Sequence, residues 1–224
     1  MSNSIVSLQK IINKVAITEH YYTQFEEGRN YHIYNRSVDR KPLYCNEGNY
    51  DFFLKQYEKY LDPVLETYSY CLLGNHFHLL IGIKNLANFR DTEQIDITKT
   101  THDIVSHQFR KFFQSYSMAF NKQQNRTGTL FQTPFKRSFV DNDYYFKKLV
   151  QYIHGNPQMH GLTNDFREWH FSSYNKMAKG GKSILSKNIV LDFFGGKDNF
   201  HKTHQDVFQE IRQYRFSLES NQGD

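Results

Sequence analysis

The sequence of 224 residues predicts an α+β fold, with helices packed on a face of one antiparallel sheet. Alternating apolar residues predict strands at 31–36, within 68–83 and at 135–140. Between them, residues 49–61 and 105–120 carry apolar side chains at helical spacing. The resulting order of elements, β-α-β-β-α-β, is that of a ferredoxin-like sheet.

Residues that favour turns and helix ends set the expected bounds of these elements. Asn49 is a good N-cap for the first helix, and Pro63 ends it. Residues 68–83 form either a hairpin with its turn at 74–75 or one bent strand pair. The polar, aperiodic residues 85–101 predict a mobile loop.

A further helix is predicted after the last strand. Residues 141–143 supply N-caps, Pro157 ends the helix, and the apolar positions between them repeat at i, i+3, i+4 and i+7. At about 100° per residue, Tyr152 and Asn156 lie roughly 40° apart on one flank. His154 projects roughly 160° from Tyr152, so it is a poor candidate to act with it.

Two other tyrosines precede Tyr152 on the same helix. Tyr144 points elsewhere, whereas Tyr145 lies two turns before Tyr152 on almost the same line. The sequence leaves open whether Tyr145 acts together with Tyr152.

The run His76-Phe77-His78 lies in the second half of the predicted hairpin. Alternate residues of a strand share a face, so the two imidazoles point the same way while Phe77 is buried on the other face of a half-covered strand. The imidazoles are either two nitrogen ligands for a metal ion or two histidines hydrogen-bonded to neighbours. The His-x-His pair alone does not decide between these alternatives.

Five segments carry motifs in a fixed order: 29–36 (RNYHIYNR), 72–79 (LLGNHFHL), 128–137 (GTLFQTPFKR), 151–157 (QYIHGNP) and 169–174 (WHFSSY). Together they resemble the single-tyrosine HUH nucleases, and most closely the REP-associated tyrosine transposases related to small insertion-sequence transposases. Two positions depart from the pattern. Gly74 stands where the family usually has proline, and Asn156 stands where the insertion-sequence relatives carry glutamine. An asparagine at that position resembles the REP-associated branch.

This resemblance implies an HUH nuclease fold and a specific chemistry. His76, His78 and Asn156 would hold Mg²⁺ or Mn²⁺, which neutralises and orients a phosphodiester. Tyr152 would attack the phosphorus and give a covalent 5′-phosphotyrosine and a free 3′-hydroxyl. Because a phenol has an unperturbed pKa of about 10, Tyr152 needs help from the field of the metal or from a base that the sequence does not identify.

Positive charge is concentrated in one part of the chain. Residues 101–160 hold eight basic residues against three acidic ones, a surplus equal to the formal net charge of +5 of the whole chain. Such a cluster neutralises phosphates and attracts polyanions. Charge alone indicates a nucleic acid or only solvated helix faces, and the resemblance implies single-stranded or hairpin DNA as the partner, bound with an affinity that falls as salt rises. The expected DNA-binding residues are Arg110, Lys111, Lys136, Arg137 and Lys148.

The chain is expected to have three regions: an N-terminal extension at 1–28, an HUH nuclease domain at 29–160 and a C-terminal helical extension at 161–224. Within the last region, residues 166–178 and 199–215 have helical patterns. This extension either packs on the catalytic domain or grips a hairpin through its lysines.

Composition sets the expected surroundings of the protein. No stretch has the character of a transmembrane helix or a signal peptide, and the two cysteines lack paired-motif spacing. We expect a cytoplasmic protein, nucleoid-associated when bound to DNA, with no membrane partner. Monomer and homodimer both remain open.

The leading hypothesis is a metal-dependent single-stranded DNA endonuclease and strand-transferase. The alternatives are a non-cleaving hairpin-DNA or structured-RNA binding protein on the same fold, and a zinc hydrolase built on the His-x-His pair. A pure binder has no need of His76, His78, Tyr152 and Asn156 together, so the set favours the enzyme. The lack of a nearby carboxylate ligand makes the hydrolase the least favoured.

Overall fold

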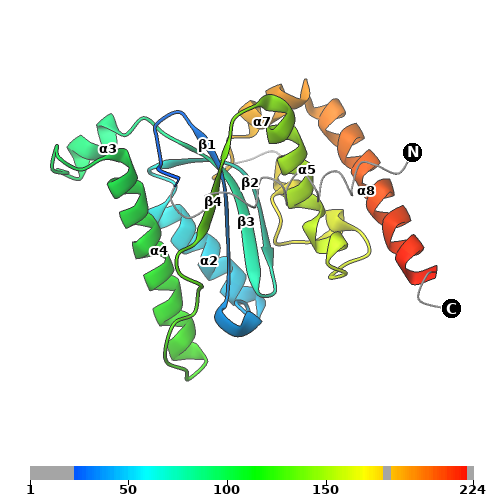
Figure 1. Cartoon of the computed structure of the whole chain (residues 1–224), viewed down its shortest axis with the longest axis horizontal. Helices are drawn as coiled ribbons and strands as arrows, with labels where there is room; N and C mark the ends of the chain where they lie inside the picture. Colours follow the sequence, from blue (N-terminus) through cyan, green and yellow to red (C-terminus); the bar gives the residue numbers. More distant parts are fainter. Residues whose placement is uncertain (1–22, 179–182, 221–224) are drawn as a thin grey trace.

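The computed structural model describes residues 23–178 and 183–220 of the chain. Within these ranges, one antiparallel sheet with strand order β2-β3-β1-β4 forms the centre of the fold (Figure 1). The strands are β1 (Asn30–Arg36), β2 (Leu65–Leu73), β3 (His76–Ile83) and β4 (Lys136–Val140). This order confirms the predicted α+β class and the ferredoxin-like arrangement, and β2 and β3 form the hairpin. Most of the predicted N-terminal extension lies outside the described residues.

Two helices cover one face of the sheet (Figure 1): α2 (Glu47–Tyr60) and α4 (Thr101–Gln123). Their aromatic side chains pack on the strand residues that point toward them. The ring centroid of Phe53 lies 5.2 Å from that of Phe77 and 4.8 Å from that of Phe112. Burial of apolar surface stabilises a fold by roughly 25 cal/mol per Å², so this layer of large rings is a main source of its stability.

Two bounds differ from those predicted. α2 begins about one turn earlier, because Asn46 is its N-cap and accepts the backbone N–H of Asn49 at 3.1 Å. The side chain of Asn49 instead accepts the backbone N–H of Cys45 at 2.9 Å. The predicted loop at 85–101 contains a short helix, α3 (Ala87–Thr92).

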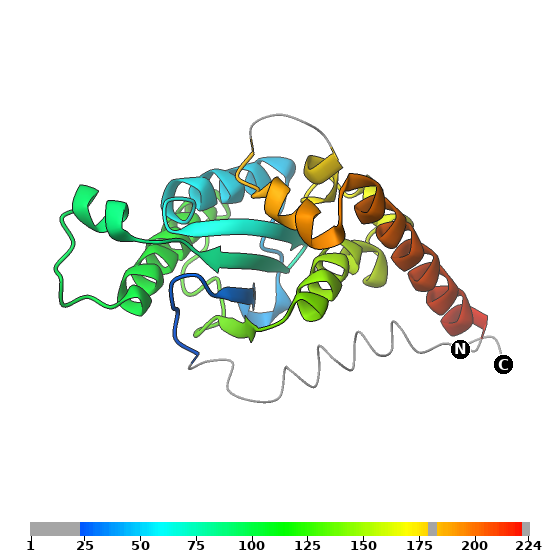
Figure 2. The same ribbon diagram turned by 90° about the horizontal axis from the view of Figure 1, so that it is seen from above.

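The opposite face of the sheet is covered by α5 (Asp143–Met159), as Figures 1 and 2 show. Asn142 caps this helix, as predicted, and its side chain accepts a backbone N–H at 2.8 Å. Pro157 lies inside the last turn and does not end the helix. Only one bond of the ladder is lost at the proline, and the turn still closes because the N–H of His160 donates to the carbonyl of Asn156 at 2.9 Å.

The predicted helix at 166–178 is helical only at its ends, as η2 (Phe166–Glu168) and α6 (Tyr174–Ala178). Between them, the chain runs along the outer edge of β2, where the N–H of Leu72 donates to the carbonyl of Phe171 at 2.9 Å. A sheet edge offers unpaired backbone groups, and pairing with them replaces the helical bonds that this segment would otherwise form.

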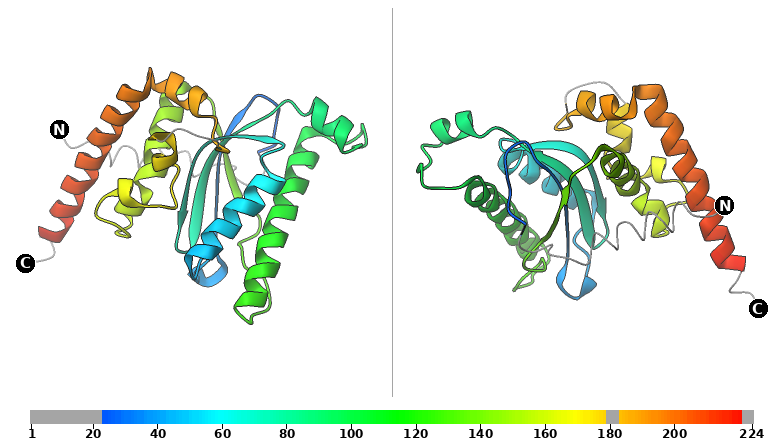
Figure 3. Two further views of the ribbon diagram at one scale, coloured as in Figure 1. Left: turned by 180° about the vertical axis from the view of Figure 1, so that it is seen from behind. Right: turned by 45° about the horizontal axis from the view of Figure 1, so that its top comes forward.

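Helix α8 (Lys197–Ser220) lies on the side of α5 away from the sheet (Figure 3). Helix α7 (Lys187–Phe194) contacts both α5 and β2, and just before it the backbone N–H of Ser186 donates to the carbonyl of Thr67 on β2 at 2.9 Å. The close approach of α8 requires a glycine on α5: a Cβ added at Gly155 would come within 2.9 Å of Ile211 Cδ1. The C-terminal region therefore packs on α5, and some of the lysines that could grip a hairpin, at 179–182, lie outside the described residues. None of the helices in the described ranges is long and apolar enough to cross a membrane.

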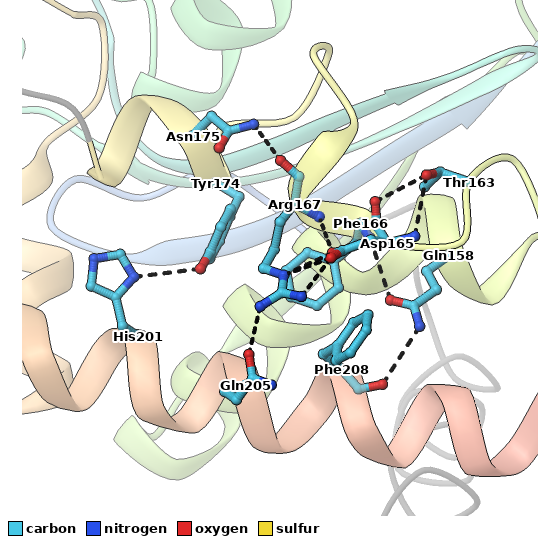
Figure 4. A network of polar contacts seen from close by, with 10 residues as sticks. All are labelled: Gln158, Thr163, Asp165, Phe166, Arg167, Tyr174, Asn175, His201, Gln205 and Phe208. Carbon is cyan, nitrogen blue, oxygen red and sulfur yellow. Dashed lines mark hydrogen bonds and ion pairs between the residues drawn. The ribbon is translucent and has the colours of Figure 1, made fainter.

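A polar network joins the end of α5 and the loop after it to α8 (Figure 4). The guanidinium of Arg167 donates from Nε to Asp165 Oδ1 at 2.8 Å and from Nη1 to Gln205 Oε1 at 2.6 Å. It also lies over the ring of Phe208, 4.3 Å from the centroid. Gln158 on α5 donates to the carbonyl of Phe208 at 3.5 Å. These contacts fix the C-terminal end of α5 against α8.

A buried chain of hydrogen bonds fixes the middle of α5. His204 Nδ1 lies 2.8 Å from the carbonyl of Phe200, which can only accept, so this nitrogen carries the proton. His204 Nε2 then accepts from His154 Nδ1 at 2.9 Å, and His154 Nε2 accepts from Ser173 Oγ at 2.7 Å. Both imidazoles are fully buried. His154 therefore holds α5 to α8 and points away from Tyr152, as helix geometry predicted.

This histidine chain predicts that acid destabilises the fold. Burial lowers the pKa of His204 to about 3, whereas in the unfolded chain a histidine has a pKa of about 6.5. Below pH 6.5 the unfolded state thus binds a proton that the folded state does not, so stability is complete above that pH and falls toward the folded pKa. We expect His204 to account for up to about 2 kcal/mol of the stability lost between pH 7 and pH 5.

Urea unfolding at the two pH values measures this effect. In His204→Gln, which retains a side-chain acceptor for His154, the loss between pH 7 and pH 5 should be smaller than in the unaltered protein. Equal losses in the two proteins would show that His204 is not responsible.

Candidate active site

The register of the sheet brings two histidines onto the face covered by α5. In the pairing of β1 with β3, His78 lies opposite Tyr34 and His76 lies opposite Arg36. Phe77 between them points to the other face and is buried against α2. Strand β3 is thus covered on both faces and not half-covered as predicted, because α5 packs over the histidine face.

Each of these histidines uses its Nδ1 atom in a hydrogen bond. His76 Nδ1 lies 2.8 Å from the side-chain oxygen of Asn75, and His78 Nδ1 lies 3.0 Å from Nε2 of His32 on β1. The amide oxygen only accepts, so His76 carries its proton on Nδ1 and keeps a lone pair on Nε2. In His78, too, Nε2 is the nitrogen left for a ligand. Such orientation by the other ring nitrogen is typical of metal-binding histidines.

Burial lowers the pKa of both imidazoles. The pKa of His76 falls to about 4, with His160 and Arg36 adding to the effect of burial. The pKa of His78 lies well below its usual range, first because of burial and then because of the neighbouring His32. Both side chains are therefore uncharged at neutral pH, which is the state in which imidazole binds a metal.

Tyr152 meets these histidines from α5. Its ring centroid lies 5.6 Å from that of His78, and the two ring planes are at 84°. Tyr152, His76 and His78 line one cavity of about 380 Å³. Residues that are distant in the sequence, on a strand and on a helix, are thus brought to a single site.

The phenol of Tyr152 is not activated by the protein alone. Burial raises its pKa to about 12, Tyr34 adds to the rise, and the amide of Asn156 acts in the opposite direction. A phenol with this pKa is protonated at neutral pH and is a weak nucleophile. Attack by Tyr152 therefore requires additional positive charge close to its oxygen.

Asn156 offers an oxygen with no partner. Its side chain is fully buried, and its Nδ2 donates to the backbone carbonyl of Tyr152 at 2.8 Å. In the part of the chain that the structure describes, its Oδ1 accepts no hydrogen bond. An unsatisfied buried acceptor costs about 1–3 kcal/mol, so this oxygen is suited to a ligand, although Asn156 is not among the described residues that line the cavity of His76 and His78.

These donors fit a labile divalent ion. The imidazoles of His76 and His78 suit transition metals, and the amide oxygen of Asn156 suits harder ions such as Mg²⁺ and Mn²⁺. Among the described residues, no three side chains of His, Cys, Asp or Glu are grouped so that they could hold a metal. A structural zinc site, which requires four ligands, finds no support in those residues.

The other tyrosines of α5 are placed differently. Tyr145 is buried near Tyr34 and Tyr152, and burial raises its pKa to about 12, but it is not among the described side chains that line the cavity. Tyr144 is 63% exposed and points elsewhere, as predicted. Of the three tyrosines on α5, Tyr152 is the one that lines the cavity.

The structure does not bring the five expected DNA-binding residues together. Lys136 lines the cavity, and Lys148 lies on α5, the helix that carries Tyr152. Arg110 and Lys111 lie on α4, in the layer on the other face of the sheet (Figure 1). Closeness in sequence therefore grouped residues that the sheet separates.

Arg137 also points away from the cavity. It lies opposite Ile33 in the register of β1 and β4, on the face covered by α4, and is 8% exposed. Its Nε donates to the carbonyl of Thr23, and its guanidinium lies 5.1 Å from the ring centroid of Phe25. Alternation along β4 places the neighbouring Lys136 on the histidine face and Arg137 in the core.

Five residues near the histidines were missed in the sequence. Tyr34, Arg36, Arg40 and His160 line the cavity, and His32 supports His78. The signal was present in β1, where His32, Tyr34 and Arg36 alternate as the histidines of β3 do. Only the register of the two strands shows that they share a face, and register is not evident in the sequence.

No family model matches the chain. A curated Haemophilus influenzae protein named "Putative REP-associated tyrosine transposase" is 26% identical over 117 residues, which cover 51% of this chain and 61% of that protein. The match thus spans less than two thirds of that relative.

Two solved structures are similar in fold to different degrees. A REP-associated tyrosine transposase bound to a REP hairpin aligns with a TM-score of 0.53 and 17% identity, over 80% of this chain and 98% of that one. A bacterial tRNA(His) guanylyltransferase-like protein in complex with ATP is 9% identical, with a TM-score of 0.36, over 88% of this chain and 81% of that one. The second likeness is too weak to support an argument. In sequence and in fold, the chain is similar to REP-associated tyrosine transposases, which confirms the resemblance predicted from its motifs.

Proposed function

We propose that this chain is a divalent-metal-dependent endonuclease and strand-transferase for single-stranded DNA, acting at hairpin or palindromic sites. The observation that carries the proposal is the meeting of Tyr152 with His78, ring centroids 5.6 Å apart, in a cavity that His76 also lines. The hairpin bound by the structural relative and the name of the curated relative support this substrate and this activity.

His76, His78 and Asn156 would hold the metal ion through two uncharged imidazoles and the unpaired amide oxygen. When bound, the ion neutralises the phosphate and supplies the positive charge that the phenol of Tyr152 lacks. Three neutral ligands compensate little of a charge of 2+, so we expect weak binding until the phosphate is present.

The reaction itself is a single displacement at phosphorus. The Oη of Tyr152 gives up its proton and attacks, the bond between phosphorus and O3′ breaks, and O3′ takes up a proton as a free hydroxyl. The 5′-phosphate stays on the tyrosine. Attack by a 3′-hydroxyl on this phosphotyrosine reverses the step, which allows a strand to be rejoined or transferred.

Trapping the covalent adduct tests the proposal. The protein is incubated with a labelled hairpin-bearing oligonucleotide in Mg²⁺ or Mn²⁺ and separated on a denaturing gel. A labelled protein band that requires the metal is expected. If the protein binds the hairpin but gives no adduct with either ion, the non-cleaving binding protein becomes the better account, and the raised pKa of Tyr152 explains its inertness.

A further inference from the structure

The cavity of Tyr152 carries strong positive charge. Arg36, Arg40 and Lys136 line it, and no aspartate or glutamate does so among the described residues. A cleft that holds charge of one sign within low-dielectric walls attracts ions of the opposite sign.

Two of these cations have no carboxylate partner among residues 23–178 and 183–220. In the described ranges, the ion pairs within 4.0 Å involve Arg29, Lys41 and Arg167, and neither Arg36 nor Arg40. The guanidinium of Arg36 lies close enough to the site to lower the pKa of His76 and of His160.

Arg36 is held in place by its strand. It lies opposite His76 in the register of β1 and β3. Its N–H donates to the side chain of Asn35 at 2.9 Å, and its carbonyl accepts from the N–H of Gln132 at 2.9 Å. The side chain therefore leaves the sheet beside a proposed metal ligand.

Arg40 is held by a strained turn. Asp39 and Arg40 have φ values of 58° and 56°, which residues other than glycine rarely adopt and which cost about 1–3 kcal/mol each. Asn75 Nδ2 donates to the carbonyl of Arg40 at 3.0 Å, and its Oδ1 bonds to His76 Nδ1 at 2.8 Å. One amide thus joins the turn that carries Arg40 to the ring of His76.

We propose that Arg36 and Arg40 form a second phosphate subsite, which holds a backbone phosphate next to the one that Tyr152 attacks. The inference rests on the proposed function and deepens it by naming what fixes the strand in the cavity. A guanidinium binds phosphate oxygens with paired, charge-assisted hydrogen bonds, and two guanidiniums without a carboxylate partner suit one phosphate between them.

Replacement of single phosphates tests the subsite. Hairpin oligonucleotides in which one linkage at a time is an uncharged methylphosphonate are bound to Tyr152→Phe protein, which cannot cleave them. At one linkage next to the scissile position, we expect the affinity to fall roughly tenfold. In the double variant Arg36→Gln/Arg40→Gln, made in the same background, the same linkage should cause no further loss, because both of its partners are gone, and in each single variant the loss should be smaller than in the parent.

Salt and matched variants sharpen the test. Each arginine variant should lower the slope of log affinity against log salt by about 0.7. Lys41→Gln and Arg126→Gln, which remove charges outside the cavity, should keep the full loss at that linkage. The substitution Arg40→Gln leaves the backbone carbonyl of residue 40 in place to accept from Asn75. Circular dichroism checks that each variant is folded.

Two outcomes separate the subsite from the function. If methylphosphonate replacement of each linkage lowers the affinity as much in the arginine variants as in the Tyr152→Phe parent, the subsite is wrong while the proposed function stands. If the parent binds no single-stranded or hairpin DNA at all, the proposed function fails, and the subsite with it.

Discussion

Tyr152→Phe is expected to abolish the covalent protein–DNA adduct while leaving the fold intact. The substitution removes only the hydroxyl group, and the ring keeps its place 5.6 Å from that of His78. Without the oxygen no bond to phosphorus forms, so the adduct should be undetectable on a denaturing gel. The free energy of unfolding should change by less than about 1 kcal/mol, measured by urea denaturation.

Tyr145→Phe is the matched control. Tyr145 is a buried tyrosine of the same helix, and its pKa is raised to about 12 as that of Tyr152 is. It does not line the cavity, so this variant should form the adduct at nearly the normal rate. An adduct that persists in Tyr152→Phe and disappears in Tyr145→Phe would show that Tyr145 is the nucleophile and that the assignment to Tyr152 is wrong.

His78→Ala is expected to reduce cleavage in Mg²⁺ or Mn²⁺ by at least about a thousandfold, while hairpin binding stays within a few-fold of normal. A metal at a transferring phosphate supplies several kcal/mol of charge stabilisation, and removal of a ligand forfeits it. The phosphates of the hairpin are bound mainly by cations, which the substitution does not touch. Single-turnover cleavage and equilibrium binding separate the two effects.

His32→Gln distinguishes support of the metal ligand from ligation. The Nε2 of His32 bonds to His78 Nδ1 at 3.0 Å, so this variant should misorient the ring and lower activity by roughly 10–100-fold. Calorimetry tests the metal chemistry itself. Tight, stoichiometric binding of zinc, together with no nuclease activity in Mg²⁺ or Mn²⁺, would contradict the proposal.

Local patterns were sufficient to predict most of the fold. Period-two alternation found the strands, and apolar spacing found α2, α4 and α5, because each of these elements buries one face against the sheet. The errors arose where contacts distant in sequence decide the structure. Residues 169–173 have a helical pattern, but the open edge of β2 takes their backbone hydrogen bonds instead.

Part of the candidate site, too, could be predicted from local patterns, and the rest depends on contacts distant in sequence. Helix geometry was enough to put Tyr152 and Asn156 on one flank and to turn His154 away. The support of His78 by His32 could not be predicted, because it depends on how β1 and β3 are aligned. Charge was the least reliable guide, since counting along the chain cannot tell on which face of the sheet a lysine or arginine lies.

The two faces of the central sheet differ in what they tolerate. On the α2 and α4 side, Phe53, Phe77 and Phe112 interlock, so truncating one of them leaves a void that costs about 3–5 kcal/mol. On the α5 side, His78 and Tyr152 are buried as well, but they line a cavity, and Tyr152→Phe would remove the phenol oxygen while it keeps the packed ring. A substitution of this kind would erase the proposed chemistry at little cost to folding, so a descendant without the reaction would still be a stable scaffold.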